Sequence, residues 1–142
     1  MNSAIAITNL LYTYGEMMDA ADFDGASHLL RHTTVRLMGG REINGVGMRD
    51  IWAQMIVLDD QGRANTRHVI TNPILDIDEP AGEASCRSCY TVLQCLSGFP
   101  LQVIASGRYH DRFSRIEGLW QFTFRDYSMF DHQGDLSQHL RM

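Results

Sequence analysis

The sequence predicts an α+β domain in which N-terminal helices pack against a strongly curved antiparallel sheet. Apolar residues in the first half recur at the three- and four-residue spacing of a helix face. The second half holds long runs rich in β-branched and aromatic residues, separated by short turns. Helices followed by hairpin-connected strands are typical of the α+β class. The 142 residues are enough for one core, and we expect a single domain over residues 1–142.

Three helices are expected in the first half of the chain. The first, over residues 3–20, has an apolar face formed by Ile7, Leu10, Leu11, Tyr14, Met17 and Met18. The second runs from Asp22, which is suited to cap a helix N-terminus, to residue 30. A β-branched segment at 33–38 predicts a short strand, and the spacing over 48–58 predicts the third helix.

Four long strands are expected in the second half, over residues 67–78, 83–96, 101–116 and 119–129. Pro73 lies inside the first of them. Because proline has no N–H to donate, it indicates an edge strand or a bulge. The hairpin connections predict that these strands are antiparallel. The polar tail that follows, to the end of the chain, matches no element.

Alternation along the third strand predicts one apolar and one polar face. The apolar set is Leu101, Val103, Ala105, Gly107, Tyr109 and Phe113, and the polar set is Gln102, Ser106, Arg108, His110 and Arg112. Two small residues, Ala105 and Gly107, lie at the centre of the apolar set. They leave room for a ligand or a packed helix; alternatively, Gly107 marks only a kink in the strand. The two interpretations are compatible.

The composition excludes several classes of function. The chain has 12 basic and 17 acidic residues and no basic run, which argues against nucleic-acid binding. It has no apolar run of the ~20 residues that span a bilayer and no secretory leader, so we expect no membrane association and a cytoplasmic location. No nucleotide-binding glycine motif is present, and the histidines lack zinc-site spacing. We therefore expect neither a cofactor nor a metal.

The cysteines are Cys86, Cys89 and Cys95. The C-x-x-C spacing of the first two is typical of redox and zinc sites. Residues three apart on a strand point to opposite faces, however, so this pair is poorly placed to form a disulfide or chelate one metal. We expect all three thiols to be free.

Asp19 and His68 are the candidate catalytic residues. Asp19 comes at the end of the first helix beside its apolar face, where partial desolvation raises the pKa of a carboxylate and makes it a better base. His68 opens the first long strand, on the same face as Ile70 and Asn72. A histidine beside a carboxylate is a common general base. The alternatives are a solvated helix-end aspartate and a histidine that is merely hydrogen-bonded where the strand begins.

Three tyrosines are candidate substrate-binding residues: Tyr14 on the first helix and Tyr90 and Tyr109 on strands. A tyrosine hydroxyl can polarise a substrate oxygen, but tyrosine is also ordinary core material. His110 shares a face with Arg108 and Arg112, and we expect it on the outside of the sheet.

Four strings resemble the SnoaL-like, or nuclear-transport-factor-like, superfamily, and they occur in the order found there. They are Tyr14 with Asp19-Ala20-Ala21-Asp22-Phe23-Asp24; Arg67-His68 with Asn72; Gly107-Arg108-Tyr109 with Asp111-Arg112-Phe113, Gly118, Trp120 and Arg125; and Gly134-Asp135-Leu136-Ser137 with His139-Leu140. The resemblance covers nearly the whole chain. It implies a cystatin-like cone with an interior pocket.

The same superfamily includes scytalone dehydratase and hexachlorocyclohexane dehydrochlorinase. In both, an aspartate and a histidine at positions similar to Asp19 and His68 form the catalytic pair. The chain departs from the dehydratase at Met18, where that enzyme has a tyrosine, and it has no clear counterpart of the dehydratase's second histidine. The strings also resemble the β subunits of ring-hydroxylating dioxygenases, which bind no metal themselves and support an iron-bearing α subunit.

These observations lead to three alternative functions. The first is a cofactor-independent lyase, dehydratase or isomerase acting on a small, cyclic, partly apolar substrate, with His68 as base and Asp19 as its partner. The second is a non-catalytic partner like a dioxygenase β subunit, and the third is a ligand-binding domain without chemistry. Because the helices cover only one face of the long strands, and superfamily relatives cover the other with a second subunit, we also expect a homodimer.

Overall fold

The structure, a computed structural model, describes residues 2–141. Its helices are α1 (Ser3–Asp19), α2 (Phe23–Leu29) and α3 (Met48–Met55), with a short 3-10 turn (Gly45–Gly47) before α3. Its strands are β1 (Thr34–Arg36), β2 (Glu42–Asn44), β3 (Thr66–Asp78), β4 (Glu83–Leu96), β5 (Phe99–Ile116), β6 (Leu119–Asp126) and β7 (Phe130–Gln133). Met142, the last residue of the polar tail, lies outside the described residues. None of the helices described is long and apolar enough to cross a membrane.

The first two helices begin and end within one residue of the prediction. Asn2 caps α1 by accepting a hydrogen bond from the Ile5 amide at 2.9 Å, and Asp22 caps α2 through the Gly25 amide at 2.9 Å. Between the helices, Ala21 adopts a left-handed backbone conformation, with φ of 56°, which ends α1. Asp19 is therefore the last helical residue.

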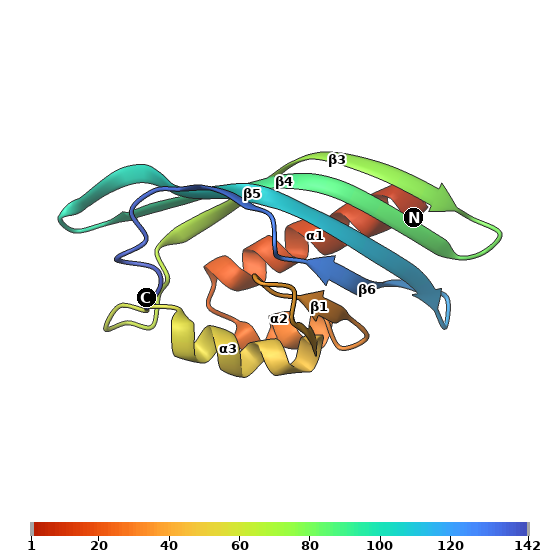
Figure 1. Cartoon of the computed structure of the whole chain (residues 1–142), viewed down its shortest axis with the longest axis horizontal. Helices are drawn as coiled ribbons and strands as arrows, with labels where there is room; N and C mark the ends of the chain where they lie inside the picture. Colours follow the sequence, from red (N-terminus) through yellow and green to blue (C-terminus); the bar gives the residue numbers. More distant parts are fainter. Residues whose placement is uncertain (1, 142) are drawn as a thin grey trace.

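The strands form one seven-stranded sheet in the order β2-β1-β6-β5-β4-β3, with β7 paired to β5. The long strands are antiparallel, as predicted, but β1 pairs with β6 in parallel, so the sheet is mixed. The sequence did not predict β2 or β7, and β7 begins the tail that matched no element. Figure 1 shows the sheet arching over the helices, which lie together on its concave side.

The pairing of the long strands shifts register at several places, and two of these bulges bear on the sequence predictions. In β3 the register shifts between Thr71 and Ile74, around Pro73, and β3 is an edge strand, so both readings of this proline are confirmed. The bulge leaves Asn72 exposed with a positive φ of 53°, so that it does not share the inward face of His68, contrary to expectation.

The second bulge corrects the faces predicted for the third strand. Ala105 pairs with Val92, but Val103 pairs with the next residue along, Leu93. The extra residue inverts the alternation, because a shift of one position moves a side chain to the other face. Leu101 and Val103 are therefore 67% and 52% exposed on the outer face, whereas Ala105 is buried. The remaining members of the predicted apolar set are buried as expected: Gly107, Tyr109 and Phe113.

The three cysteines are free, as predicted. Cys86 is buried, Cys89 is half-buried and Cys95 is exposed. Cys86 and Cys89 are three residues apart on β4, and their different burial reflects the alternation of side chains across the sheet.

Candidate functional site

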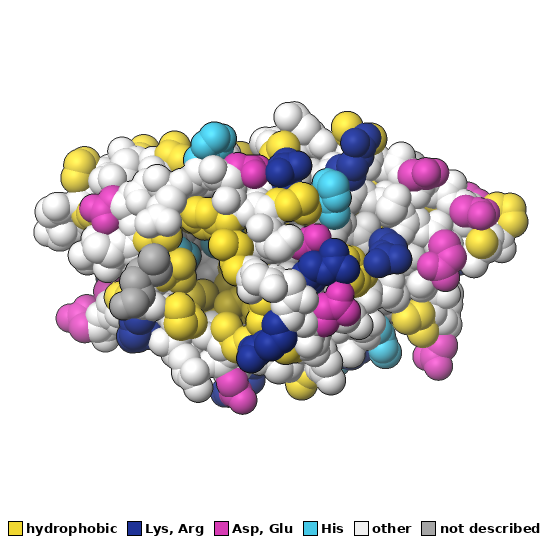
Figure 2. All heavy atoms as spheres, in the orientation of Figure 1, with side chains coloured by type: hydrophobic (Ala, Val, Ile, Leu, Met, Phe, Trp, Pro, Cys, Tyr) yellow, Lys and Arg dark blue, Asp and Glu magenta, His cyan; other side chains and the backbone are white. Residues whose placement is uncertain are grey.

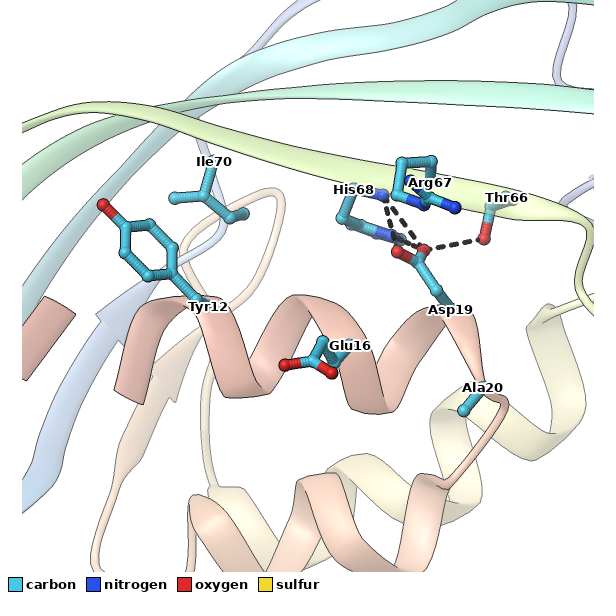
Figure 3. Close-up of a pocket in the computed structure, with 8 residues that line it drawn as sticks. All are labelled: Tyr12, Glu16, Asp19, Ala20, Thr66, Arg67, His68 and Ile70. Atoms are coloured by element: carbon cyan, nitrogen blue, oxygen red, sulfur yellow. Dashed lines mark hydrogen bonds and ion pairs between the residues drawn. The ribbon is translucent and has the colours of Figure 1, made fainter. Parts of the chain in front are cut away.

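Asp19 and His68 are joined by three hydrogen bonds. The His68 ring nitrogen Nδ1 lies 2.6 Å from Asp19 Oδ1, and the His68 backbone N–H donates to both carboxylate oxygens, at 3.0 and 2.8 Å. Thr66 donates its hydroxyl to Oδ1 at 3.0 Å (Figure 3). The side chains of His68 and Asp19 are 9% and 15% exposed. The end of α1 and the start of β3 thus form one compact polar unit, although 49 positions separate the two residues.

This geometry defines the role each ring nitrogen of His68 can take. A carboxylate only accepts hydrogen bonds, so Nδ1, which faces it, is the donor. In the neutral ring the other nitrogen, Nε2, is then an unprotonated acceptor. The arrangement is that of a base held in one tautomer by an aspartate.

The pair separates two hollows in the molecule. An outer groove of about 610 Å³ is lined by Tyr12, Glu16, Asp19, Ala20, Thr66, Arg67, His68 and Ile70, which Figure 3 shows between α1 and β3. An inner cavity of about 410 Å³ lies on the concave side of the sheet. His68 lines both hollows, whereas Asp19 lines only the outer groove. The aspartate therefore lies behind the histidine as viewed from the cavity.

The inner cavity is predominantly apolar. Its walls come from α1, α3, the long strands and the C-terminal tail, and they include Met18, Trp52, Val92 and Leu136. No Lys, Arg, Asp or Glu is among the described residues that line it. Figure 2, in the same orientation as Figure 1, shows a hollow surrounded by hydrophobic side chains. The cavity is suited to an uncharged molecule, because a buried charge would find no counter-ion there.

All three predicted tyrosines, Tyr14, Tyr90 and Tyr109, line this cavity. Tyr127, which the sequence analysis did not select, lines it as well, and its hydroxyl is hydrogen-bonded to that of Tyr14. Burial raises the pKa of Tyr90 to about 12, and it also raises the pKa values of Tyr14, Tyr109 and Tyr127 well above that of a free tyrosine. These hydroxyls stay protonated near neutral pH and can donate hydrogen bonds to a bound oxygen.

The space above Gly107 is filled by the Tyr90 side chain, so this glycine does not open room for a ligand. It also does more than mark a kink in the strand. A Cβ atom built on it would meet the Tyr90 hydroxyl and lie 2.5 Å from the Met129 carbonyl oxygen. The absence of a side chain at this position is what lets the Tyr90 ring lie across β5 and stack on Tyr109, with centroids 4.6 Å apart.

A buried ion pair lies behind the tyrosines. Arg125 donates two hydrogen bonds to Asp111, at 2.7 and 2.9 Å, and neither side chain is exposed to solvent. The Arg125 guanidinium carbon lies 3.8 Å from the Tyr109 ring centroid and 4.4 Å from that of Tyr14. Its positive charge partly offsets the effect of burial by lowering the pKa values of these tyrosines. Arg125 entered the sequence analysis only through the family resemblance.

His139 is a second imidazole at the cavity, and the sequence analysis missed it as a site residue. It is 8% exposed, and its Nδ1 has no hydrogen-bond partner among residues 2–141. Burial, together with the neighbouring His68, lowers the pKa of His139 to about 4, although Asp19 opposes the change. The only sequence signal was its place in the tail string that resembles the superfamily. His110 is exposed on the outer face, as expected.

Among the described residues, no group of three or more His, Cys, Asp or Glu side chains is placed to hold a metal ion. The site geometry described above consists of one histidine–aspartate pair, a second histidine, and tyrosine hydroxyls around an apolar space.

Residues 2–126 match the sequence profile of the SnoaL-like domain. No curated protein sequence matches the chain significantly.

Several solved structures have similar folds. A protein of unknown function with a cystatin-like fold from Nostoc punctiforme superposes with a TM-score of 0.72 at 20% identity, over 92% of each chain. A protein from Novosphingobium aromaticivorans assigned as a scytalone dehydratase has a TM-score of 0.66 at 18% identity, over 87% of this chain and 80% of that one. The β subunit of an assigned aromatic-ring-hydroxylating dioxygenase from the same organism has a TM-score of 0.69 at 16% identity, over 96% and 95%. At these identities the similarity shows the cystatin-like α+β fold alone.

Proposed function

This chain belongs to the SnoaL-like domain family, and on that premise we propose that it is a cofactor-independent lyase, dehydratase or isomerase whose base is His68. The observation that carries the proposal is the 2.6 Å contact between His68 Nδ1 and Asp19 Oδ1 at the wall of an apolar cavity. The apolar wall around this base limits its hydration, which favours the removal of a carbon-bound proton.

In the proposed reaction, His68 Nε2 removes a proton from a carbon next to a carbonyl or to the carbon that bears a leaving group. Asp19 holds the ring in the reactive tautomer and balances the positive charge that the ring acquires. A tyrosine hydroxyl, from Tyr14, Tyr90 or Tyr109, donates a hydrogen bond to the substrate oxygen on which negative charge develops.

The size and lining of the cavity favour a small, cyclic and partly apolar substrate. Its volume of about 410 Å³ is within the range of small-molecule sites and leaves space for a molecule of one or two rings. Aromatic and methionine side chains provide flat and adaptable walls, and the absence of charged lining residues in the described part disfavours ionic substrates.

The proposal can be tested without the natural substrate. The uncharged bicyclic probe 5-nitrobenzisoxazole loses the proton on carbon 3 of its isoxazole ring to a base. The N–O bond then breaks as a nitrile forms, and the product is a coloured phenolate. We expect the protein to accelerate this reaction, and His68→Ala and Asp19→Asn to lower the rate by about 10² to 10⁴-fold while still folding. His110→Ala, at an exposed histidine, is the matched control and should react like the unmodified protein.

Three outcomes would contradict the proposal. The first is full activity in both dyad variants, and the second is the absence of any acceleration by the unmodified protein. In the third, both variants lose their cooperative melting transitions, which would mean that the pair is structural.

The second candidate is a non-catalytic partner subunit. It is supported by the similarity to a dioxygenase β subunit, which extends over nearly the whole of both chains. Under this proposal the dyad variants would fold and show no change in any proton-abstraction assay. The chain would instead bind an iron-bearing α subunit encoded beside it.

A further inference from the structure

We propose that His139 binds the ligand in the inner cavity and selects an uncharged ring compound that carries a hydroxyl group. This inference rests on the assignment of the cavity as the binding site under the proposed function. It adds to that function a recognition residue and a class of substrate.

The fold holds His139 in place at the cavity. The His139 backbone N–H donates to the Leu136 carbonyl at 2.9 Å, and its carbonyl accepts from the Val57 N–H at 2.8 Å. The preceding carbonyl, of Gln138, accepts from the side-chain amide of Gln94 at 3.0 Å. The backbone around His139 is therefore bonded to two separate parts of the molecule, which fixes the point on the cavity wall from which the side chain extends.

The His139 imidazole has unused hydrogen-bonding capacity. His139 lines the cavity and is nine-tenths buried, yet its Nδ1 has no hydrogen-bond partner among residues 2–141. Buried polar atoms are nearly always paired, since an unpaired one keeps the cost of lost hydration. By contrast, His68 Nδ1 is fully engaged by Asp19. The two imidazoles of the cavity thus differ in role: one is held as a base, and the other has hydrogen-bonding capacity to spare.

The charge of the surroundings defines what His139 can recognise. Burial and the nearby His68 keep this ring neutral near pH 7, so it offers one donor and one acceptor. Apart from His68, the polar groups on the cavity wall include the tyrosine hydroxyls and Gln133, which are also uncharged. A hydroxyl group both donates and accepts, so it satisfies either tautomer of the ring. An anionic or cationic ligand would find no opposite charge on the described lining residues.

The test compares 2-naphthol with 2-methoxynaphthalene, which have the same ring system, but only the first has a hydroxyl proton. Binding is followed by the fluorescence of Trp52, which lines the cavity, in a Trp120→Phe background that removes the other tryptophan. We expect 2-naphthol to bind about five- to tenfold more tightly, and His139→Phe to abolish this preference while leaving 2-methoxynaphthalene binding unchanged. His110→Phe, at an exposed histidine, should keep the preference.

A second measurement does not depend on a variant that folds. In protein labelled with ¹⁵N-histidine, the ring-nitrogen signals of His139 should shift with 2-naphthol but not with 2-methoxynaphthalene. The proposal would be overturned if the two probes bound equally well or if 2-naphthol did not bind. It would also be overturned if a folded His139→Phe protein kept the preference, or if the His139 signals did not shift. The His68→Ala variant distinguishes the role of His139 in binding from the proposed role of His68 as a base. It should still prefer 2-naphthol although it no longer removes a proton. If the preference is intact but base chemistry never appears, only the proposed function fails.

Discussion

Thr66 and His68, two residues apart on β3, donate hydrogen bonds to the same oxygen of Asp19, at 3.0 and 2.6 Å. A shared acceptor couples the two donors, because the Thr66 hydroxyl limits how the carboxylate can rotate. The orientation of the His68 ring therefore depends on a residue that does not line the inner cavity.

Replacing Thr66 by valine should weaken the dyad without removing it. Thr66→Val keeps the shape and β propensity of the side chain but loses the hydrogen bond to Asp19. We expect a rate loss of about tenfold with 5-nitrobenzisoxazole, much smaller than that of His68→Ala, and little change in melting temperature. Thr71→Val, on the same strand but away from the dyad, serves as control. Equal losses in both threonine variants would show that the effect is on the strand rather than on the dyad.

Breaking the buried pair of Arg125 and Asp111 should be strongly destabilising. Arg125→Met leaves the Asp111 carboxylate buried without a partner, and we expect the free energy of unfolding to fall by about 3–5 kcal/mol. The double variant Arg125→Met/Asp111→Leu should recover part of this loss, because it leaves no buried charge. Urea unfolding measures both effects. Arg49→Ala, which removes an exposed arginine paired with Asp24, should leave the unfolding midpoint nearly unchanged.

The stability of the protein should fall between pH 7 and pH 4.5, partly because of His139. Its pKa is about 4 in the folded protein and about 6.5 when unfolded, so in this range the unfolded chain binds the extra proton. The folded state therefore loses stability as the pH falls through 6.5, by on the order of 2 kcal/mol at pH 4.5. His139→Phe should lack this contribution. Urea unfolding at both pH values checks it, and parallel losses in the two proteins would contradict it.

The three thiols should react in the order of their exposure. Cys95 is exposed and should react first with a disulfide reagent, followed by half-buried Cys89. Burial raises the pKa of Cys86 to about 11, and this thiol should react only after unfolding. Mass spectrometry of alkylated peptides, without reduction, should find all three cysteines labelled in denaturant. A disulfide between Cys86 and Cys89 would contradict the β4 geometry.

We expect a homodimer that buries the outer face of the long strands. Val69 on β3 and Val103 on β5 are exposed there, beside Leu101. Val69→Asp/Val103→Asp should convert the dimer to a monomer in sedimentation at micromolar concentration. Val46→Asp, at an exposed valine outside the long strands, should leave the dimer intact. A monomeric unmodified protein would contradict the expectation.

The sequence alone predicted correctly those features that depend on residues close together in the chain. The apolar period of α1, the Asp22 cap and the limits of β4 depend on neighbours within a few positions, and each agrees with the structure. The free state of the thiols followed from the same alternation of side chains. The resemblance to the SnoaL-like superfamily added the fold and the pairing of Asp19 with His68, whose hydrogen bond the structure contains.

The tertiary structure alone decided the features that depend on contacts between distant segments. The bulge that turns Leu101 and Val103 outward is set by the pairing of β5 with β4, since the alternating sequence is equally compatible with an unbroken strand. His139 enters the site because Val57 and Gln94 bond the tail to the rest of the molecule, and nothing near it in sequence indicates a cavity. Arg125 and Tyr127 join the tyrosines because β6 and the segment after it fold back beside β5. Periodicity reports which side of an element faces inward, but only chain packing determines which inward side chains meet.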